Sequence, residues 1–253
     1  MKKYQSLLVI GANSELILPL LEEAFQHKIE MHLTYHDSKS HIQKFFDLAR
    51  SEKREKENVF LYKLDLTDKD SVNEFCLNNN LYPDLLILAA GLTDESLNLD
   101  EKKEDSLISK IYLVNLISPT QIINSFVERY FKREDLNLDV VCLSSVAGIR
   151  GRKKNMYYSA SKAGLNSFLS SLRQKCHKKK IRIFTVLPGY VDTRMISNIF
   201  PPKFLVVSPK KICNKIINCL RKNQQIIYPN FIWKAVSLTL RLIPEKVFKS
   251  LKF

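Results

Sequence analysis

A serine, a tyrosine and a lysine stand in an order and spacing that suit proton transfer to a carbonyl group. Tyr158 follows Ser145 by 13 positions and precedes Lys162 by four. Residues four apart share one face of a helix, so a helix here brings Tyr158 and Lys162 together and turns the adjacent Tyr157 away. A free tyrosine, with a pKa near ~10, is a poor base, and a neighbouring ammonium group favours its phenolate. Tyr158 is therefore the candidate acid and base.

Two further polar residues could serve the same chemistry. Ser145 ends the apolar run "LDVVCLSS", where its hydroxyl could hydrogen-bond a substrate carbonyl. Asn115 lies in "YLVNLIS", among apolar neighbours in a helical pattern that asparagine does not favour. It could hold a water against the site. Each of these residues alone is more often structural, so the case depends on the whole set.

The elements that must position these residues alternate between strand and helix patterns. Continuous apolar runs such as "LLILAA" and "VVCLSS" indicate strands covered on both faces, as in parallel sheets. Alternation of this kind predicts an α/β fold with a doubly wound parallel sheet, in a single domain over residues 1–253. Strand patterns occupy residues 6–12, 30–36, 59–68, 83–91, 138–148 and 180–189, with helical patterns between most of them, for example over 15–28 and 106–131.

The first strand-to-helix turn lies where a phosphate would bind. In open parallel sheets, ligands bind at the carboxyl ends of strands and phosphates sit at the first helix N-terminus. In "IGANSELI", Gly11 makes the turn, and Asn13 and Ser14 offer hydrogen bonds. It is a poor glycine fingerprint, because Glu15 and Ile17 occupy the places of the second and third glycines. Alone, it could equally be an ordinary turn.

Later strand ends add support for a nucleotide site. Asp65 follows an apolar strand, where its carboxylate could accept a hydrogen bond from an adenine amino group. The small residues of "LAAG", at 88–91, would let a ligand lie against the backbone. Each feature could also be a helix cap or a turn. Their occurrence at successive strand ends favours nucleotide binding.

Together these residues resemble the short-chain dehydrogenase/reductase family, from residue 6 to about residue 195. The most specific part is Ser145 with "YSASK" at 158–162, joined by Asn115 and by "PGYVDT" at 188–193. The resemblance implies a Rossmann fold, a nicotinamide cofactor and reversible hydride transfer between an alcohol and a ketone. It leaves residues 196–253 as a substrate-side and C-terminal segment.

The resemblance also implies residue roles. By position, Tyr158 is the general acid and base, Lys162 holds the ribose and lowers the tyrosine pKa, and Ser145 orients the carbonyl. Asn115 supports a water-linked proton relay, and Thr193 contacts the nicotinamide amide. The implied cofactor-binding set is Gly11, Asn13, Ser14, Tyr35, His36, Asp65, Leu66, Ala89, Ala90, Gly91, Tyr158, Lys162, Pro188, Gly189, Val191 and Thr193.

Two positions depart from the family pattern. Relatives usually carry glycines where this chain has Glu15 and Ile17. Ile17 is expected to push the first helix from the sheet, and Glu15 to add negative charge near the cofactor pyrophosphate. Since the reacting set is complete, we interpret this as a variant cofactor loop that bears on cofactor affinity.

The end of the second strand bears on cofactor choice. Relatives that prefer NAD place an acid there to bind the ribose hydroxyls. This chain has Tyr35, followed by His36, and its first acid is Asp37. The missing acid removes the obstacle to a 2′-phosphate, which His36 and Lys39 could bind. The sequence therefore favours NADP over NAD.

The chain is strongly basic, with 40 Lys and Arg against 26 Asp and Glu and a net charge of +14. Such a bias favours anionic partners, although a lysine-rich genomic composition would also produce it. The loop "GIRGRKKNMY" carries Arg150, Arg152, Lys153 and Lys154 between Ser145 and the tyrosine. It predicts either a solvated basic loop or capture of an anionic substrate group.

The C-terminal stretch from Pro229 to Phe253 combines apolar and basic residues. From Lys203 onward there are eleven Lys or Arg and one acid, Glu245. Pro244 is expected to divide the stretch into two short helices that lie in a membrane interface. The competing interpretation packs it over the substrate cleft or against another subunit. The expected interfacial side chains are Phe231, Trp233, Leu238, Leu240, Leu242 and Ile243.

This stretch resembles bacterial reductases of polyprenyl-phosphate-linked keto-sugars. The predicted function is thus NADPH-dependent reduction of a lipid-linked or phosphorylated keto-sugar, with a fatty-acyl or other lipid ketone as the alternative. A non-catalytic nucleotide-sensing or nucleic-acid-binding regulator is a third class, which the intact reacting set argues against. We expect a homo-oligomer in the cytoplasm that contacts the acidic inner face of the membrane, without nucleic acid.

No metal site and no membrane span are expected. The five cysteines are scattered and odd in number, without the spacing of metal ligands, which is typical of reduced thiols in a cytosolic protein. The basic start "MKKYQSLLVIG" superficially suggests a signal peptide. Its apolar run stops at Gly11 without a small-residue cleavage site, so a buried strand is the better interpretation.

Overall fold

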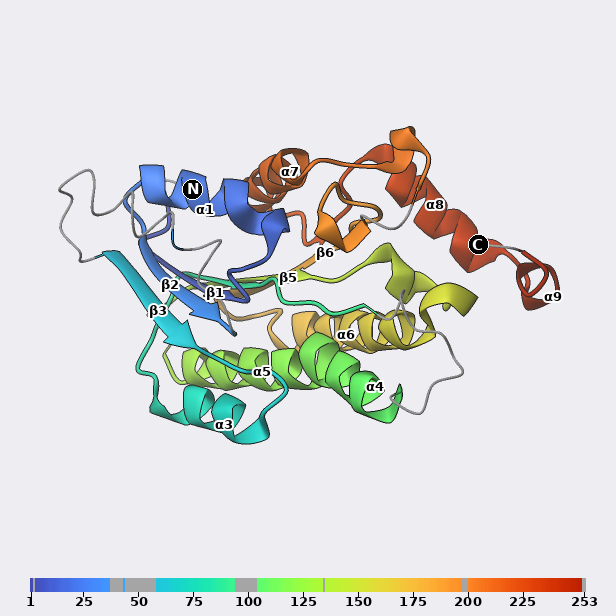
Figure 1. The fold of residues 1–253 in the computed structure, drawn as a ribbon. Coiled ribbons are helices and arrows are strands. Elements are labelled where there is room, and N and C mark those ends of the chain that lie inside the picture. The colour runs from blue at the N-terminus through green and yellow to red at the C-terminus, as the bar shows by residue number, and fades with distance from the viewer. Residues whose placement is uncertain are drawn as a thin grey trace.

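The computed structural model describes residues 1, 3–36, 43, 58–93, 104–133, 135–196 and 200–251. Within them a seven-stranded sheet lies between two layers of helices (Figure 1). All strand pairs are parallel, and the order β3-β2-β1-β4-β5-β6-β7 confirms the predicted doubly wound sheet. The strands are β1 Ser6–Ile10, β2 Glu30–Tyr35, β3 Val59–Lys63, β4 Leu85–Leu88, β5 Leu138–Leu143, β6 Ile181–Val186 and β7 Ile226–Ile227.

The helices cover both faces of the sheet. Helices α1 and α7 lie on one face, and α3, α5 and α6 on the other (Figure 1). Strand β1 shows why its apolar run is continuous: Leu7 and Val9 join the core on one face, and Leu8 and Ile10 join that on the other. The helices are α1 Leu18–Gln26, α3 Lys69–Asn78, α4 Glu104–Tyr112, α5 Ser118–Phe131, α6 Met156–Lys175, α7 Pro209–Lys222, α8 Phe231–Leu242 and α9 Glu245–Phe248.

The helical pattern predicted over residues 106–131 is not one regular helix. A π-helical segment, Leu113–Ile117, separates α4 from α5 and contains Asn115. Single π-turns inside α-helices occur often at functional sites. Here the segment holds Asn115 fully buried, with 0% exposure of the residue.

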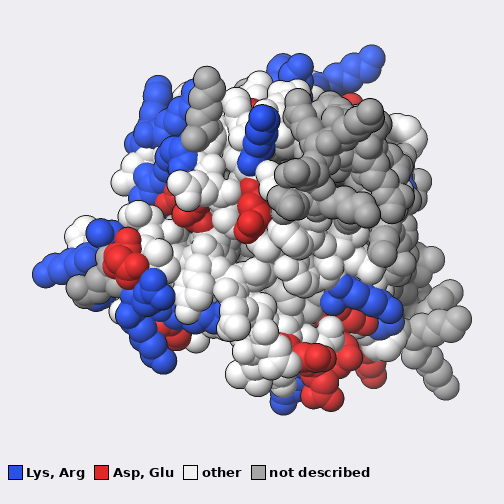
Figure 2. Space-filling view, turned by 90° about the vertical axis from the view of Figure 1, so that its left-hand side faces the viewer, with Lys and Arg blue, Asp and Glu red and all other residues white. Residues whose placement is uncertain are grey.

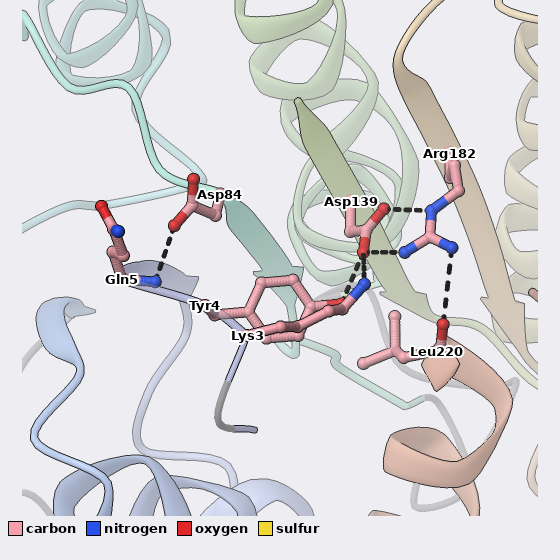
Figure 3. A network of polar contacts seen from close by, with 7 residues as sticks. All are labelled: Lys3, Tyr4, Gln5, Asp84, Asp139, Arg182 and Leu220. Carbon is pink, nitrogen blue, oxygen red and sulfur yellow. Dashed lines mark hydrogen bonds and ion pairs between the residues drawn. The ribbon is translucent and has the colours of Figure 1, made fainter. Parts of the chain in front are cut away.

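The amino ends of the strands are fastened by a polar network around the buried carboxylate of Asp139, in β5 (Figure 3). Tyr4 donates its hydroxyl hydrogen to Asp139, Lys3 donates from Nζ over 3.1 Å, and Arg182 donates from Nε over 2.6 Å. Arg182 also donates to the carbonyl of Leu220, which closes α7 onto this edge. Burial and the adjacent carboxylate raise the pKa of Tyr4, which keeps its hydroxyl a donor. This network lies at the sheet edge opposite the carboxyl ends of the strands.

Candidate active site

A cavity of about 670 Å³ lies along the carboxyl ends of the strands. Its size is within the range of about 300–1,000 Å³ typical of small-molecule and cofactor sites. Asn115 is outside this lining. All sixteen residues predicted to bind a cofactor line it, as does Ser145: Gly11, Asn13, Ser14, Tyr35, His36, Asp65, Leu66, Ala89, Ala90, Gly91, Ser145, Tyr158, Lys162, Pro188, Gly189, Val191 and Thr193.

Helix α6 carries Tyr158 and Lys162 on one face, as their spacing predicts. The Lys162 ammonium lies 5.8 Å from the centroid of the Tyr158 ring. It is buried, and it donates a hydrogen bond of 3.1 Å to the carbonyl of Leu143 at the end of β5. Burial lowers the pKa of Lys162 to about 8. Tyr157 is half-buried and is not among the residues lining the cavity.

Ser145 is fixed between two strand ends. Its hydroxyl caps the 3-10 turn Val146–Ile149 by accepting from the backbone N–H of Ala147 over 3.0 Å. The same hydroxyl donates a longer bond of 3.4 Å to the carbonyl of Pro188. Ser145 and Tyr158 also line a second cavity of about 60 Å³.

Asn115 braces the segment after β4. Its side-chain amide accepts from the backbone N–H of Leu92 over 2.8 Å and donates to the Leu92 carbonyl over 2.7 Å. It also donates to the Ser161 hydroxyl on α6 over 3.1 Å. Asn115 therefore holds the segment containing Gly91 against α6. The predicted water-linked relay stays a prediction.

The cofactor turn requires glycine at its first position. Gly11 has a φ of +79°, and a Cβ there would lie 2.7 Å from the backbone nitrogen of Ala90. Ile17 ends a 3-10 turn, Glu15–Ile17, after which α1 begins at Leu18. Its side chain is fully buried, so the core accommodates the bulk that departs from the family pattern.

Glu15 does not present an unopposed negative charge to this turn. Its Oε2 accepts from the backbone N–H of Arg194 over 2.8 Å, and its Oε1 accepts from the Arg194 Nε. Arg194 also lines the large cavity. Arg194 was not predicted as a site residue, although it directly follows Thr193, the last residue of the motif at 188–193.

Asp65 is engaged within the protein. Its carboxylate accepts from the Thr67 backbone N–H over 2.8 Å and from the Thr67 hydroxyl over 2.7 Å, and lies 3.2 Å from His36. Burial raises the pKa of Asp65, but the hydrogen bonds from Thr67 and the contact with His36 outweigh burial and lower it overall. The predicted adenine contact is untested. Asp37 and Lys39 lie outside the described residues.

Arg150 in the basic loop is neither solvated nor placed to capture an anionic substrate group, the two roles predicted for that loop. Its guanidinium donates to the carbonyl of Leu240 over 3.0 Å and to that of Ile243, and pairs with Glu245 over 2.6 Å. It also lies 3.9 Å from the centroid of the Phe248 ring. Arg150 thus caps the C-terminus of α8 and ties it to the loop between Ser145 and Tyr158.

The other basic residues of the loop differ among themselves. Arg152 is half-buried and lines the 60 Å³ cavity, whereas Lys153 and Lys154 are exposed. Of these three residues, Arg152 is the one that lines a cavity together with Ser145 and Tyr158.

The C-terminal stretch forms two helices separated at Pro244, as predicted. The prediction that Trp233 and Leu240 face a membrane interface is wrong, because both residues are buried in the protein. The Trp233 indole donates to the carbonyl of Leu205 over 2.9 Å, and its ring packs on Gly189. Trp233 also lines the small cavity, so the competing prediction of packing over the cleft holds for this residue.

On the face at the β3 edge, Lys and Arg side chains are interspersed with Asp and Glu (Figure 2). The described part of that face lacks the continuous basic stripe typical of nucleic-acid grooves. In the ranges that the structure describes, no group of three or more His, Cys, Asp or Glu could hold a metal ion. None of the helices described there is long and apolar enough to cross a bilayer.

Residues 6–203 match the family model described as short chain dehydrogenase. The chain is similar to an uncharacterized oxidoreductase of Mycobacterium tuberculosis, at 32% identity over 110 residues covering 44% of each protein. It is also similar to the 3-oxoacyl-[acyl-carrier-protein] reductase of Buchnera aphidicola, at 32% identity over 150 residues, which cover 57% of this chain and 59% of that protein. The chain spans about half the length of the curated relatives that it matches.

Solved structures share the fold over nearly the whole chain. A short chain dehydrogenase from Burkholderia cenocepacia in complex with NADP has a TM-score of 0.77 at 18% identity, covering 98% of this chain and 97% of that one. A short-chain dehydrogenase from Sphingobium yanoikuyae in complex with NADPH has a TM-score of 0.77 at 17% identity, covering 98% and 96%. At such identities the likeness is one of fold.

Proposed function

Because the chain belongs to the short-chain dehydrogenase/reductase family of oxidoreductases, we propose that it interconverts a ketone and a secondary alcohol with a nicotinamide dinucleotide. We further propose that it acts as an NADPH-dependent reductase of a lipid-linked or phosphorylated keto-sugar. The observation that carries the reaction is the shared location of Ser145, Tyr158 and Lys162 on the wall of one cavity.

The residues of this cavity fit a dinucleotide. Gly11, whose lack of a Cβ lets the first turn pack against Ala90, lines this cavity, and so does the buried Lys162. When bound, the cofactor would supply the hydride. Ser14, at the entrance to the first helical turn, would meet its phosphates, Lys162 its ribose and Thr193 its carboxamide.

The proton would come from Tyr158. Its hydroxyl would give a proton to the carbonyl oxygen, while the Ser145 hydroxyl, now held by a long bond to Pro188, would donate a hydrogen bond to the same oxygen. The Lys162 amine is mostly protonated below its pKa of about 8, so it would stabilise the phenolate left behind.

The end of β2 supports a preference for NADPH over NADH. Tyr35 ends this strand where an acid would oppose a 2′-phosphate, and Tyr35 and His36 both line the cavity. His36 also contacts the Asp65 carboxylate, so its imidazole is less available to a 2′-phosphate.

Arg152 supports an anionic substrate. It lines the small cavity together with Ser145 and Tyr158, where its guanidinium could pair with a phosphate. The alternative substrate is a fatty-acyl or other lipid ketone. Relatives named 3-oxoacyl-[acyl-carrier-protein] reductase and acetoacetyl-CoA reductase, which match about half of the chain, favour this alternative.

The test is NADPH oxidation with a phosphorylated keto-sugar, the same sugar without phosphate and a 3-oxoacyl thioester. We expect the phosphorylated sugar to be favoured, and Arg152→Gln to remove that advantage while Lys154→Gln keeps it. Equal turnover of both sugars would reject recognition of the phosphate. Turnover of the thioester alone would favour a fatty-acyl ketone as the substrate. In parallel, quenching of the single tryptophan, Trp233, which packs on Gly189, gives both cofactor affinities. Equal or tighter binding of NADH would overturn the cofactor preference.

We also propose that α8 and α9 attach the protein to an acidic membrane from the cytoplasmic side. Four apolar side chains are more than half exposed there: Phe231 at 80%, Leu238 at 52%, Leu242 at 81% and Val247 at 51%. The stretch also carries Lys234, Arg241, Lys246, Lys249 and Lys252, and each basic residue near an acidic surface contributes about 1 kcal/mol. Apolar area and positive charge together support an interfacial helix.

Flotation with anionic liposomes tests this attachment. Deleting the stretch would also remove Trp233 from Gly189, so the sharper variant is Phe231→Ser with Leu242→Ser, both exposed. We expect full-length protein to float at low salt, less protein to float at high salt, and the double variant to stay behind. Leu77→Ser, exposed on α3, is the matched control and should float. The alternative is that this face contacts a second copy in a homo-oligomer. In that case the full-length protein does not bind the liposomes, and the double variant has a lower sedimentation mass than the wild type.

A further inference from the structure

Glu15 and Arg194 join two parts of the cofactor cavity that lie 179 positions apart in the chain. Glu15 begins the 3-10 turn that leads into α1, at the phosphate end of the cavity. Arg194 follows Thr193 on the nicotinamide side proposed above. Both residues line the cavity of about 670 Å³. The contact therefore borders the space that a dinucleotide would enter.

Both carboxylate oxygens of Glu15 are used on the same residue. One accepts from the backbone N–H of Arg194 over 2.8 Å, and the other from its side-chain Nε. The backbone bond is important because it fixes the path of the chain at Arg194 as well as its side chain. Paired bonds of this kind from a carboxylate are directional, unlike a simple charge contact.

The segment containing Arg194 is tied down on its other side. Val191 forms a parallel bridge with Val207, and the Asp192 backbone N–H donates to the Val207 carbonyl over 3.1 Å. Residues 191–196 are thus held to the neighbouring backbone at their start and to Glu15 near their end. Breaking the contact with Glu15 would release the far end of the segment, while the bonds to Val207 still hold its start.

The contact is also weak enough to open. The Arg194 side chain is 71% exposed and that of Glu15 is 25% exposed, so water competes for both charges. Exposed pairs of this kind contribute on the order of 1 kcal/mol or less. Glu15 also stands where family members usually carry a glycine, which could not form such a pair.

We propose that Glu15 and Arg194 form a latch across the cofactor cavity. The latch opens to admit the dinucleotide and closes again over it, so it slows both entry and release. This inference rests on the proposed function, because it assumes that the cavity holds a nicotinamide dinucleotide. Glu15 and Arg194 act here on cofactor exchange and take no part in proton transfer.

The test is a stopped-flow measurement of NADPH association and dissociation in the absence of substrate. Quenching of the tryptophan fluorescence is the recorded signal. The variants are Glu15→Ala, Arg194→Gln and the double variant. Glu15→Ala removes both bonds, so we expect it to raise both rate constants about three- to fivefold, the range that an exposed ion pair allows. Arg194→Gln keeps the backbone bond to Glu15 and should raise the rate constants less. The dissociation constant should then change by less than about twofold, and the double variant should be no faster than Glu15→Ala. Glu22→Gln on α1 and Lys153→Gln on the basic loop remove exposed charges outside the cavity lining and should leave both rates unchanged.

Other outcomes would overturn the latch. If Arg194→Gln weakens NADPH binding while Glu15→Ala tightens it, then Arg194 is a phosphate ligand and Glu15 only a repelling charge. Additive effects in the double variant would show that the two side chains act separately. If the wild-type protein binds neither NADPH nor NADH, the proposed function itself fails. If the wild-type protein binds NADPH but no variant changes the association or dissociation rate, the latch is rejected and the proposed function is unaffected.

Discussion

Tyr158→Phe is expected to abolish measurable turnover and to leave cofactor binding largely intact. Removing the hydroxyl deletes the proposed proton donor, and a positioned acid or base typically contributes about 10²–10⁴-fold to the rate. The ring itself stays, together with its packing on α6 beside Lys162. The measurements are steady-state NADPH oxidation and the dissociation constant for NADPH, obtained on the same preparation.

Tyr157→Phe is the matched control, because it removes the same atom one residue earlier on the same helix. Tyr157 is not among the residues that line the cavity, so its loss should change turnover far less. A reversed order of the two variants would show that the helix presents Tyr157 and not Tyr158 to the substrate. Equal losses with weakened cofactor binding would point to a damaged helix.

Lys162→Met is expected to lower turnover by about 10²-fold or more and, at neutral pH, to stabilise the fold. The two effects have one cause, which is the burial of an ammonium group beside the proposed proton donor, Tyr158. Burial lowers the pKa of Lys162 from 10.5 to about 8, a difference that corresponds to about 3 kcal/mol. Loss of the hydrogen bond to Leu143 offsets part of the gain from methionine.

The pH dependence of this gain follows from the direction of the pKa change. Between pH 8 and 10.5 the unfolded chain keeps a proton on Lys162 that the folded protein has lost, so stability rises with pH across this window. Below pH 8 the full penalty applies to the wild-type protein. The advantage of Lys162→Met should therefore be largest near pH 7 and shrink toward pH 10.

Urea unfolding at pH 7 and at pH 9.5 measures the two free energies. Lys154→Met, on the exposed part of the basic loop, is the control for loss of one charge and should show no such pH-dependent gain. A Lys162→Met protein that is less stable than the wild type at neutral pH would show that its contacts outweigh its burial.

The parts of the structure that local pattern determines could be predicted from the sequence. The apolar runs gave six of the strands, and the 3.6-residue period placed Tyr158 and Lys162 on one face of α6. Strand β7 was not predicted, because its two residues, Ile226–Ile227, are too few to show a period. The π-helical segment around Asn115 was also missed, since its residues still follow an apolar helical pattern.

Contacts between distant segments could not be predicted. Arg150 caps α8 across 90 positions, and Glu15 meets Arg194 across 179. Neither pair has a spacing that local structure fixes. The same limit explains the error at Trp233: an aromatic residue on an amphipathic helix has the same pattern whether it faces a membrane or the Gly189 backbone. Only the course of the chain after Pro229 decides between them.

The packing of Trp233 on Gly189 restricts the order in which this enzyme can diverge. A Cβ on Gly189 would lie 1.9 Å from one carbon of the indole and 2.0 Å from another, far inside van der Waals contact. A rigid ring held by its bond to Leu205 cannot yield by so much. Gly189 therefore cannot gain a side chain while the tryptophan is present, whereas Trp233 can shrink first. A lineage that has lost the tryptophan is free to change the glycine, and tryptophan can return only after the glycine has been restored. This contact thus fixes the order in which the two positions can change.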